Sequence, residues 1–267
     1  MSPPEIRPGD GVGGLIYDWC TDDDVKLGPE GVIPIGYHAD GIEYTTSMRP
    51  GGGRSCLVAS FNILSPSVEQ RSKRYLFAVI AKHALCKCGC NGYHTYQALH
   101  AVFSWSMQLL RGERAPNMGH DGVAFSKKQL KQRLRPGTQL QVACLVQVRG
   151  DREWYGAGFR FRAPTSQYCC YLCDATLDQC YDTTDTGPHR TARKSHVRFL
   201  TECARDMLQV STLFRCPGLK LWHFTVDAMH TMDLGPLLDI LGSILYMEQM
   251  WRPVYPNMAT ALKATVK

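Results

Sequence analysis

Residues 32–44 read VIPIGYHADGIEY, and this stretch decides how the rest of the chain is interpreted. The apolar run VIPI predicts a buried strand over Val32–His38, and Asp40-Gly41 follows it directly. Asp-Gly is a common turn dipeptide, so one interpretation is a β-turn. The other is a carboxylate that holds a metal ion at the end of the strand, beside a glycine that lets a large group approach the backbone. Both stay open on these residues alone.

The pattern on the C-terminal side of this strand alternates apolar runs, turn signals and amphipathic segments. The further strands that it predicts are Cys56–Leu64, Tyr75–Ala81, Leu140–Val148 and Lys220–Val226, and the helices are Thr95–Arg111, Ser126–Arg135, Ser195–Val210 and an apolar helix within Leu234–Met250. Three consecutive strands followed by strands that helices connect predict an α/β protein with a ribonuclease H-like mixed sheet flanked by helices. A helical crossover places the fourth strand parallel to the first.

The two ends of the chain differ in composition. We expect residues 1–30, which are rich in Pro, Gly and Asp, to be a poorly ordered lead-in. Residues 31–267 are expected to form the ribonuclease H-like core, incomplete at its C-terminal end. No apolar stretch is long enough to cross a bilayer, and no signal peptide is recognisable, so we expect an intracellular protein.

Two aspartates follow the first and fourth strands. Asp40 follows the first strand and Asp151 the fourth, and neighbouring strands lie about 4.8 Å apart. Two carboxylates so close together ionise together only with a cation between them. The predicted catalytic site is therefore Asp40 and Asp151 holding Mg²⁺ or Mn²⁺ for phosphoryl transfer. Asp151 follows Gly150, so a turn is again the alternative.

Charge is distributed unevenly along a chain whose net charge is +6. Residues 111–162 hold eleven Lys/Arg against four Asp/Glu, whereas residues 1–46 hold two against nine. A basic region indicates a polyanion such as DNA, and a solvated basic face is the alternative. The residues expected to contact nucleic acid are Lys127, Lys128, Lys131, Arg133, Arg135, Arg149, Arg152, Arg160 and Arg162.

Twelve cysteines in an intracellular chain are more often free thiols or metal ligands than disulfides. Cys170 and Cys173 have the Cys-x-x-Cys spacing of a zinc knuckle, and His230 in the segment DAMH is a candidate third ligand. The alternatives are buried thiols and a hydrogen-bonded histidine. A second group, Cys86-Lys87-Cys88-Gly89-Cys90 with His94, could bind another metal, but its spacing is less diagnostic and we favour structural thiols.

Three segments together resemble the plant-type CACTA (En/Spm) transposases. They are HADGIEY, LVQVRGDREWYGAGFRFRAPTSQYCCYLCDA from residue 145, and DAMHTMDLGPLLDILGSIL from residue 227. In that family Asp-Gly closes the first strand, and an aspartate after a later strand precedes an aromatic-rich stretch and a Cys-x-x-Cys. The distance from that aspartate to the Cys-x-x-Cys is the most specific part of the resemblance.

The resemblance implies a DDE-type catalytic core that cleaves and transfers DNA strands with Mg²⁺ or Mn²⁺. Asp40 and Asp151 would be the first two acids, and Cys170, Cys173 and His230 would form a structural Zn²⁺ element. The third acid of such enzymes lies on a later helix, and none of the later carboxylates fits that position well. The resemblance also implies nuclear localisation, possible homo-oligomerisation and DNA as the partner. The alternatives are a non-catalytic zinc-containing nucleic-acid-binding protein derived from a transposon, and a zinc-stabilised interaction module.

Overall fold

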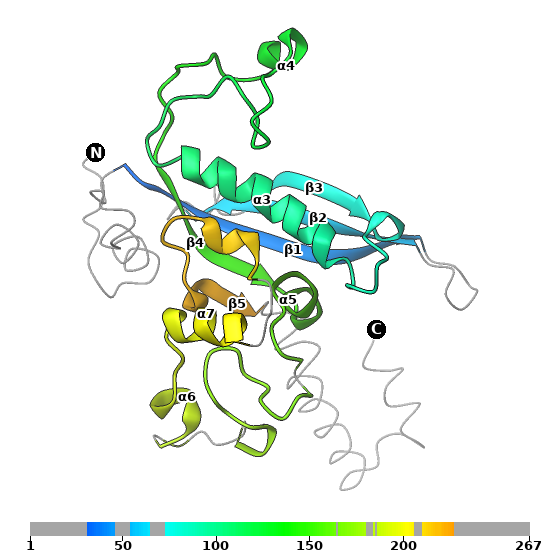
Figure 1. The fold of residues 1–267 in the computed structure, drawn as a ribbon, viewed down its shortest axis with the longest axis vertical. Helices are drawn as coiled ribbons and strands as arrows, with labels where there is room; N and C mark the ends of the chain where they lie inside the picture. Colours follow the sequence, from blue (N-terminus) through cyan, green and yellow to red (C-terminus); the bar gives the residue numbers. More distant parts are fainter. Residues whose placement is uncertain are drawn as a thin grey trace, which may run out of the picture. The chain divides into compact units, whose positions relative to one another are not determined.

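The computed structural model describes residues 31–45, 54–64, 73–163, 165–179, 184, 186–205 and 210–226, nearly all of which belong to one compact unit, Met1–Thr225. A five-stranded sheet with the strand order β3-β2-β1-β4-β5 is its centre (Figure 1). The strands are β1 (Ile33–Thr45), β2 (Arg54–Ile63), β3 (Tyr75–Ala81), β4 (Ala143–Gly150) and β5 (Phe224–Val226). The α-helices are α3 (Tyr93–Leu109), α4 (Lys127–Lys131), α5 (Arg152–Phe159), α6 (Pro188–Thr191) and α7 (His196–Arg205). Four short 3₁₀ segments are η1 (Lys82–Ala84), η2 (Leu177–Gln179), η3 (Thr212–Arg215) and η4 (Leu221–His223).

The sheet is mixed, as the order of elements predicts. β1 pairs antiparallel with β2, and β2 pairs antiparallel with β3. β1 pairs parallel with β4, in a register that runs from Ile33 opposite Ala143 to His38 opposite Arg149. Parallel neighbours require a long crossover, and the chain between β1 and β4 supplies it through β2, β3 and α3. The predicted α/β class and the parallel placement of the first and fourth strands are confirmed.

The first strand does not end at Asp40-Gly41, so the prediction that this dipeptide closes it is wrong. β1 continues to Thr45, and within it Asp40 faces Val58 and Gly41 faces Leu57 on β2. The backbone hydrogen bonds of this antiparallel ladder hold the dipeptide extended in spite of its turn propensity. The β-turn interpretation is therefore also wrong, and Asp40 is a residue of the strand interior.

One face of the sheet carries the main apolar core. Tyr37 of β1 is fully buried, and its ring centroid lies 4.5 Å from that of Phe103 on α3 and 6.0 Å from that of Trp154 on α5. Phe77 of β3 also contacts Phe103, at 5.2 Å between centroids. In Figure 1, α3 runs across this sheet in front of β1 and β2. Burial of such aromatic side chains is the largest favourable contribution to a core of this kind.

Helix α5 was not expected from the sequence, because REWYGAGF contains two glycines and few strong helix formers. Asp151 begins the helix as its N-cap, and its carboxylate accepts a hydrogen bond from the amide of Trp154. The aromatic residues Trp154, Tyr155 and Phe159 are all buried. Tertiary burial therefore stabilises a helix that its propensities do not. These rings form part of the core.

The expected boundaries hold within a few residues for β2, β3 and α3. Helix α4 is shorter than the predicted Ser126–Arg135, because no residue of it is buried and only the Ser126 capping box stabilises it. At the start of α7, the Ser195 hydroxyl accepts a hydrogen bond of 3.1 Å from the amide of Arg198, as an N-cap does. The last predicted strand is reduced to β5, because η4 takes its first part.

Several predictions fall on residues that the structure does not describe. They concern the lead-in over residues 1–30, the apolar helix within Leu234–Met250, and His230. In the part of the chain that is described, no helix is both long and apolar enough to cross a membrane.

Candidate metal centre

The clearest candidate site is the cysteine group that we had interpreted as structural thiols. The three sulfur atoms of Cys86, Cys88 and Cys90 and one ring nitrogen of His94 all lie within 4.8 Å of one another. The two sulfurs of Cys86 and Cys88 are 3.4 Å apart, and the Nδ1 atom of His94 lies 3.6 Å from the first and 3.3 Å from the second. Among the described residues, no other group of three or more His, Cys, Asp or Glu side chains converges in this way. The cluster is compatible with a structural zinc ion.

Local backbone geometry brings these side chains together. The cluster lies in the connection between η1 and α3, and the connection turns sharply through Gly89 and Gly92, whose φ angles are +87° and +79°. Left-handed values of this kind favour glycine. Gly92 is also enclosed, because an added Cβ would lie 3.2 Å from both Leu85 and Tyr96. The turns direct the sulfurs of successive cysteines toward one point.

The first turn of α3 supplies the fourth side chain of the cluster. His94 is the second residue of α3, and its imidazole reaches the sulfurs of Cys86 and Cys88 in the preceding connection. A hydrogen bond from the backbone amide of His94 is the largest cause that lowers the pKa of Cys90 to about 6; burial opposes it, and the neighbouring thiols add smaller lowering contributions. The pKa of Cys88 is raised, mainly by its hydrogen bonds with the other two thiols. Cys90 thus ionises more readily than Cys88, and a thiolate is the form that binds metal.

Cys170 and Cys173, the predicted zinc knuckle, form a pair in the described residues. Cys173 is buried, and Cys170 is half-buried and within hydrogen-bonding reach of it. Burial raises the pKa of Cys173 to about 11. The third predicted ligand, His230, lies outside the described residues, so the predicted zinc site of Cys170, Cys173 and His230 stays a prediction.

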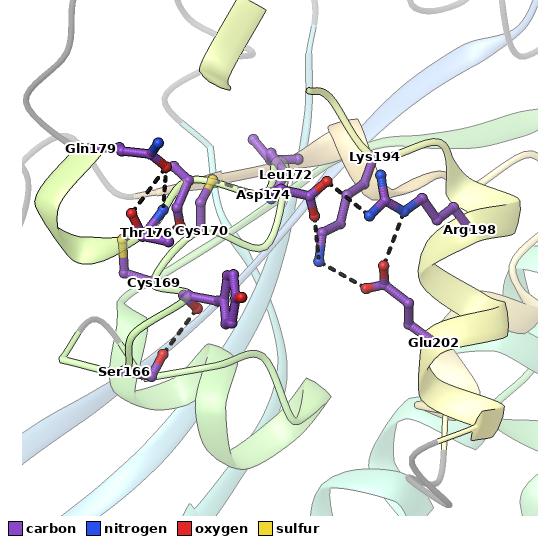
Figure 2. A network of polar contacts seen from close by, with 12 residues as sticks. Ser166, Cys169, Cys170, Leu172, Asp174, Thr176, Gln179, Lys194, Arg198 and Glu202 are labelled. Atoms are coloured by element: carbon purple, nitrogen blue, oxygen red, sulfur yellow. Dashed lines mark hydrogen bonds and ion pairs between the residues drawn. The ribbon is translucent and has the colours of Figure 1, made fainter. Parts of the chain in front are cut away.

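The segment that carries this pair is anchored to α7. Cys173 forms a β-bridge with Arg193, and the amide of Lys194 donates a 2.9 Å hydrogen bond to the carbonyl of Leu172. Figure 2 shows the side chains that complete the anchor: the Lys194 ammonium lies 2.8 Å from Glu202 and 3.6 Å from Asp174. Arg198 binds the same two carboxylates, at 2.8 Å from Asp174 and 3.0 Å from Glu202. Because the Lys194 side chain is only 6% exposed, its two ion pairs are the better shielded from solvent, whereas those of Arg198 are more exposed.

Of the predicted acidic pair, Asp40 lies within β1, and Asp151 directly follows the end of β4. The parallel register ends with His38 opposite Arg149, and two further steps along both chains lead to Asp40 and Asp151. Asp40 is half-buried, and its carboxylate accepts a 2.7 Å hydrogen bond from the amide of Gly41. The carboxylate of Asp151 is engaged as the N-cap of α5. No third carboxylate joins the two among the described residues.

The basic residues expected to contact nucleic acid fall into two groups. The first group lies in residues 111–142, which connect α3 to β4 and extend away from the sheet in Figure 1. All five of its members are exposed: Lys127, Lys128, Lys131, Arg133 and Arg135. Arg133 lies over the ring of Phe125 at 4.4 Å, and no acidic side chain of the described residues pairs with any of the five. This group is free to meet a polyanion.

The second group is engaged within the protein. Arg149 donates a 3.1 Å hydrogen bond to Asn62 on β2, and Arg152 donates to the carbonyl groups of Arg162 and Cys169. Arg160 lies over the ring of Tyr93 at 4.3 Å, and Arg162 lies over Tyr168 at 5.3 Å. Of these four residues only Arg162 is exposed. Their first role is to hold β4 and α5 in place.

A scan of protein-family models and a search of curated proteins found no match to this chain. The function is therefore argued from the residues and the geometry given above.

Proposed function

We propose that this chain is a DDE transposase-like domain of the ribonuclease H type, which binds DNA and uses Asp40 and Asp151 to hold the metal ions for strand cleavage and transfer. The observation that carries the proposal is the parallel register of β1 and β4. Continued by two residues beyond His38 and Arg149, this register leads to Asp40 within β1 and to Asp151, which directly follows β4. We infer from it that the two carboxylates lie side by side, at about the 4.8 Å spacing of neighbouring strands. A divalent cation is the species that two such carboxylates share.

The sheet supports the same proposal. Its strand order, β3-β2-β1-β4-β5, with three antiparallel strands followed by a parallel neighbour of β1, is the arrangement of a ribonuclease H-like core. The segments HADGIEY and LVQVRGDREWYGAGF, which resemble the CACTA transposases, are the segments that contain Asp40 and Asp151.

A second candidate is a non-catalytic nucleic-acid-binding protein with the same fold. Two observations favour it. The Asp151 carboxylate caps α5, and no third acid accompanies the pair in the described residues, whereas two-metal cleavage requires a fuller oxygen shell. The exposed basic group on residues 111–142 serves this function without any cleavage.

Metal-dependent nicking of supercoiled DNA by the full chain tests the first candidate. Cleavage in Mn²⁺ should disappear in Asp40→Asn and in Asp151→Asn, because each amide keeps the shape and removes the charge that binds the cation. The exposed acid of η2, changed as Asp178→Asn, is the matched control and should cleave as the parent does. Cleavage that survives Asp40→Asn overturns the catalytic proposal, and salt-dependent DNA binding without any nicking supports the second candidate.

Binding of duplex DNA tests what both candidates share. Changing Lys127, Lys128 and Lys131 together to Gln should make the slope of log K against log salt shallower by about 2.7, since each lost phosphate contact removes about 0.9. The matched control changes three other exposed cations to Gln: Lys73, Arg74 and Lys82. Equal slopes for the two triple variants would show that residues 127–131 do not contact phosphates. Absence of DNA binding in the parent chain would refute both candidates.

A further inference from the structure

We propose that Cys86, Cys88, Cys90 and His94 bind one Zn²⁺ ion, which fixes the junction between β3 and α3. This site is distinct from the acidic pair of β1 and β4 and from the Cys170–Cys173 pair. Its four side chains come from nine consecutive residues, so the local chain alone brings them together.

The distances fit a tetrahedral zinc shell. With Zn–S bonds of about 2.3 Å and a Zn–N bond of about 2.0 Å, tetrahedral ligand atoms lie about 3.5 to 3.8 Å apart. The measured separations are 3.4 Å between the sulfurs of Cys86 and Cys88, and 3.6 and 3.3 Å from these sulfurs to His94 Nδ1. All four ligand atoms lie within 4.8 Å of one another. Small rotations of the side chains are sufficient to place the four atoms around one ion.

The donor set selects zinc over the other metals that the chain is proposed to use. Three thiolates and an imidazole are soft and borderline ligands, which suit Zn²⁺ and not Mg²⁺ or Mn²⁺. Four protein ligands also fill a tetrahedral shell and leave no position for water or substrate, so the site is structural and not catalytic.

The ion would stabilise the start of α3. The N-cap of this helix is Gly92, which offers no side chain to the first free amides. His94 lies in the first turn of the helix, while Cys86 lies before the turn and its amide donates a 2.9 Å hydrogen bond to the Thr95 hydroxyl. Metal bonds to His94 and to the three cysteines would therefore link the segment that follows β3 and η1 to the first turn of α3.

That helix covers the central strands. Its buried residues include Tyr96, His100, Phe103 and Met107, and Phe103 packs against Tyr37 of β1. Fixing the first turn of α3 thus fixes the position of the element that closes this face of the sheet. Loss of the ion should loosen the β3–α3 junction first and lower the thermal stability of the whole unit.

Zinc analysis of the full chain tests the proposal, with a double variant of the two exposed ligands, Cys88→Ser and His94→Asn. We expect this variant to hold one zinc ion fewer per chain than the parent. Its exposed side chains leave the core in place, so circular dichroism should still show the folded sheet and helices. The matched control is Cys170→Ser with Cys173→Ser, which should keep the zinc that the first variant loses.

Rescue separates metal binding from packing. His94→Cys replaces one zinc ligand by another and should retain the ion, while His94→Ala should lose it or bind it weakly. Substitution by Co²⁺ should give the ligand-field absorption of a tetrahedral thiolate site in the parent and in His94→Cys, and not in the double variant. Equal zinc content in the parent and the Cys88→Ser, His94→Asn variant would overturn the proposal, as would absence of zinc from the parent after purification without chelator.

Discussion

His100 makes folding stability depend on pH between about 7 and 5. It is completely buried in α3, its ring stacks on Phe159 at 4.9 Å, and its Nδ1 atom lies 3.0 Å from the Ser211 hydroxyl. No hydrogen-bond partner among the described residues reaches its Nε2 atom. Burial therefore disfavours the charged imidazolium and lowers the pKa of His100 from 6.5 to about 3.

The magnitude follows from proton linkage. In the unfolded chain the imidazole takes up a proton as the pH falls below about 6.5, whereas in the folded protein it stays neutral down to about pH 3. The unfolded state thus binds more protons within this window, and the free energy of unfolding falls as the pH falls. Between pH 7 and pH 5 the loss from this one group amounts to about 2 kcal/mol.

Urea denaturation at pH 7 and pH 5 measures this effect, with His100→Gln as the test variant. Glutamine keeps a polar group that can reach Ser211 but does not titrate. We expect the parent to lose about 2 kcal/mol more than the variant between the two pH values. Effects common to both proteins cancel in this difference. His120→Gln, at an exposed histidine, should behave as the parent does. Equal pH dependence in the parent and His100→Gln would refute the reasoning.

Two further predictions concern packing and buried charge. Gly150→Ala should destabilise the fold by about 1–3 kcal/mol in thermal denaturation, because its Cβ would lie 2.2 Å from a ring carbon of Trp154. Gly41→Ala, where nothing lies within 4 Å of the added Cβ, is its control, and equal effects of the two would contradict this explanation. Lys194→Met should cost about 3 kcal/mol, because it leaves two partly buried carboxylates without the ammonium between them. Arg198→Met removes two ion pairs of a side chain that is 49% exposed and should cost less than about 1 kcal/mol, so an equal loss in the two variants would argue against a special role for burial.

Two elements, β3 and α3, could be predicted from the local pattern of apolar residues alone. YLFAVIA is β3 with the predicted bounds, and the apolar spacing of α3 located that helix within two residues. β3 is a continuous apolar run bounded by turn residues, and α3 has apolar side chains at helical spacing, which follows directly from the geometry of the backbone. The parallel placement of β1 and β4 could also be predicted, since a crossover between them admits few arrangements.

Tertiary contacts determined the elements whose local sequence favours a different secondary structure. Asp40-Gly41 has turn propensity, yet the ladder with β2 keeps it extended within β1. The glycine-rich α5 is helical because Trp154, Tyr155 and Phe159 bury their rings in the core, and the energy of that burial exceeds the weak preferences of its backbone.

At the cysteine cluster, too, the sequence identifies the residues, whereas the tertiary structure determines that they converge. The sequence identifies four candidate ligands, Cys86, Cys88, Cys90 and His94. The spacing Cys-x-Cys-x-Cys, however, does not by itself predict that the three thiols converge on one point. The left-handed turns at Gly89 and Gly92, followed by the first turn of α3, direct the sulfurs and the imidazole together. Convergence of ligands depends on the path of the backbone in three dimensions, and residue spacing alone does not specify that path.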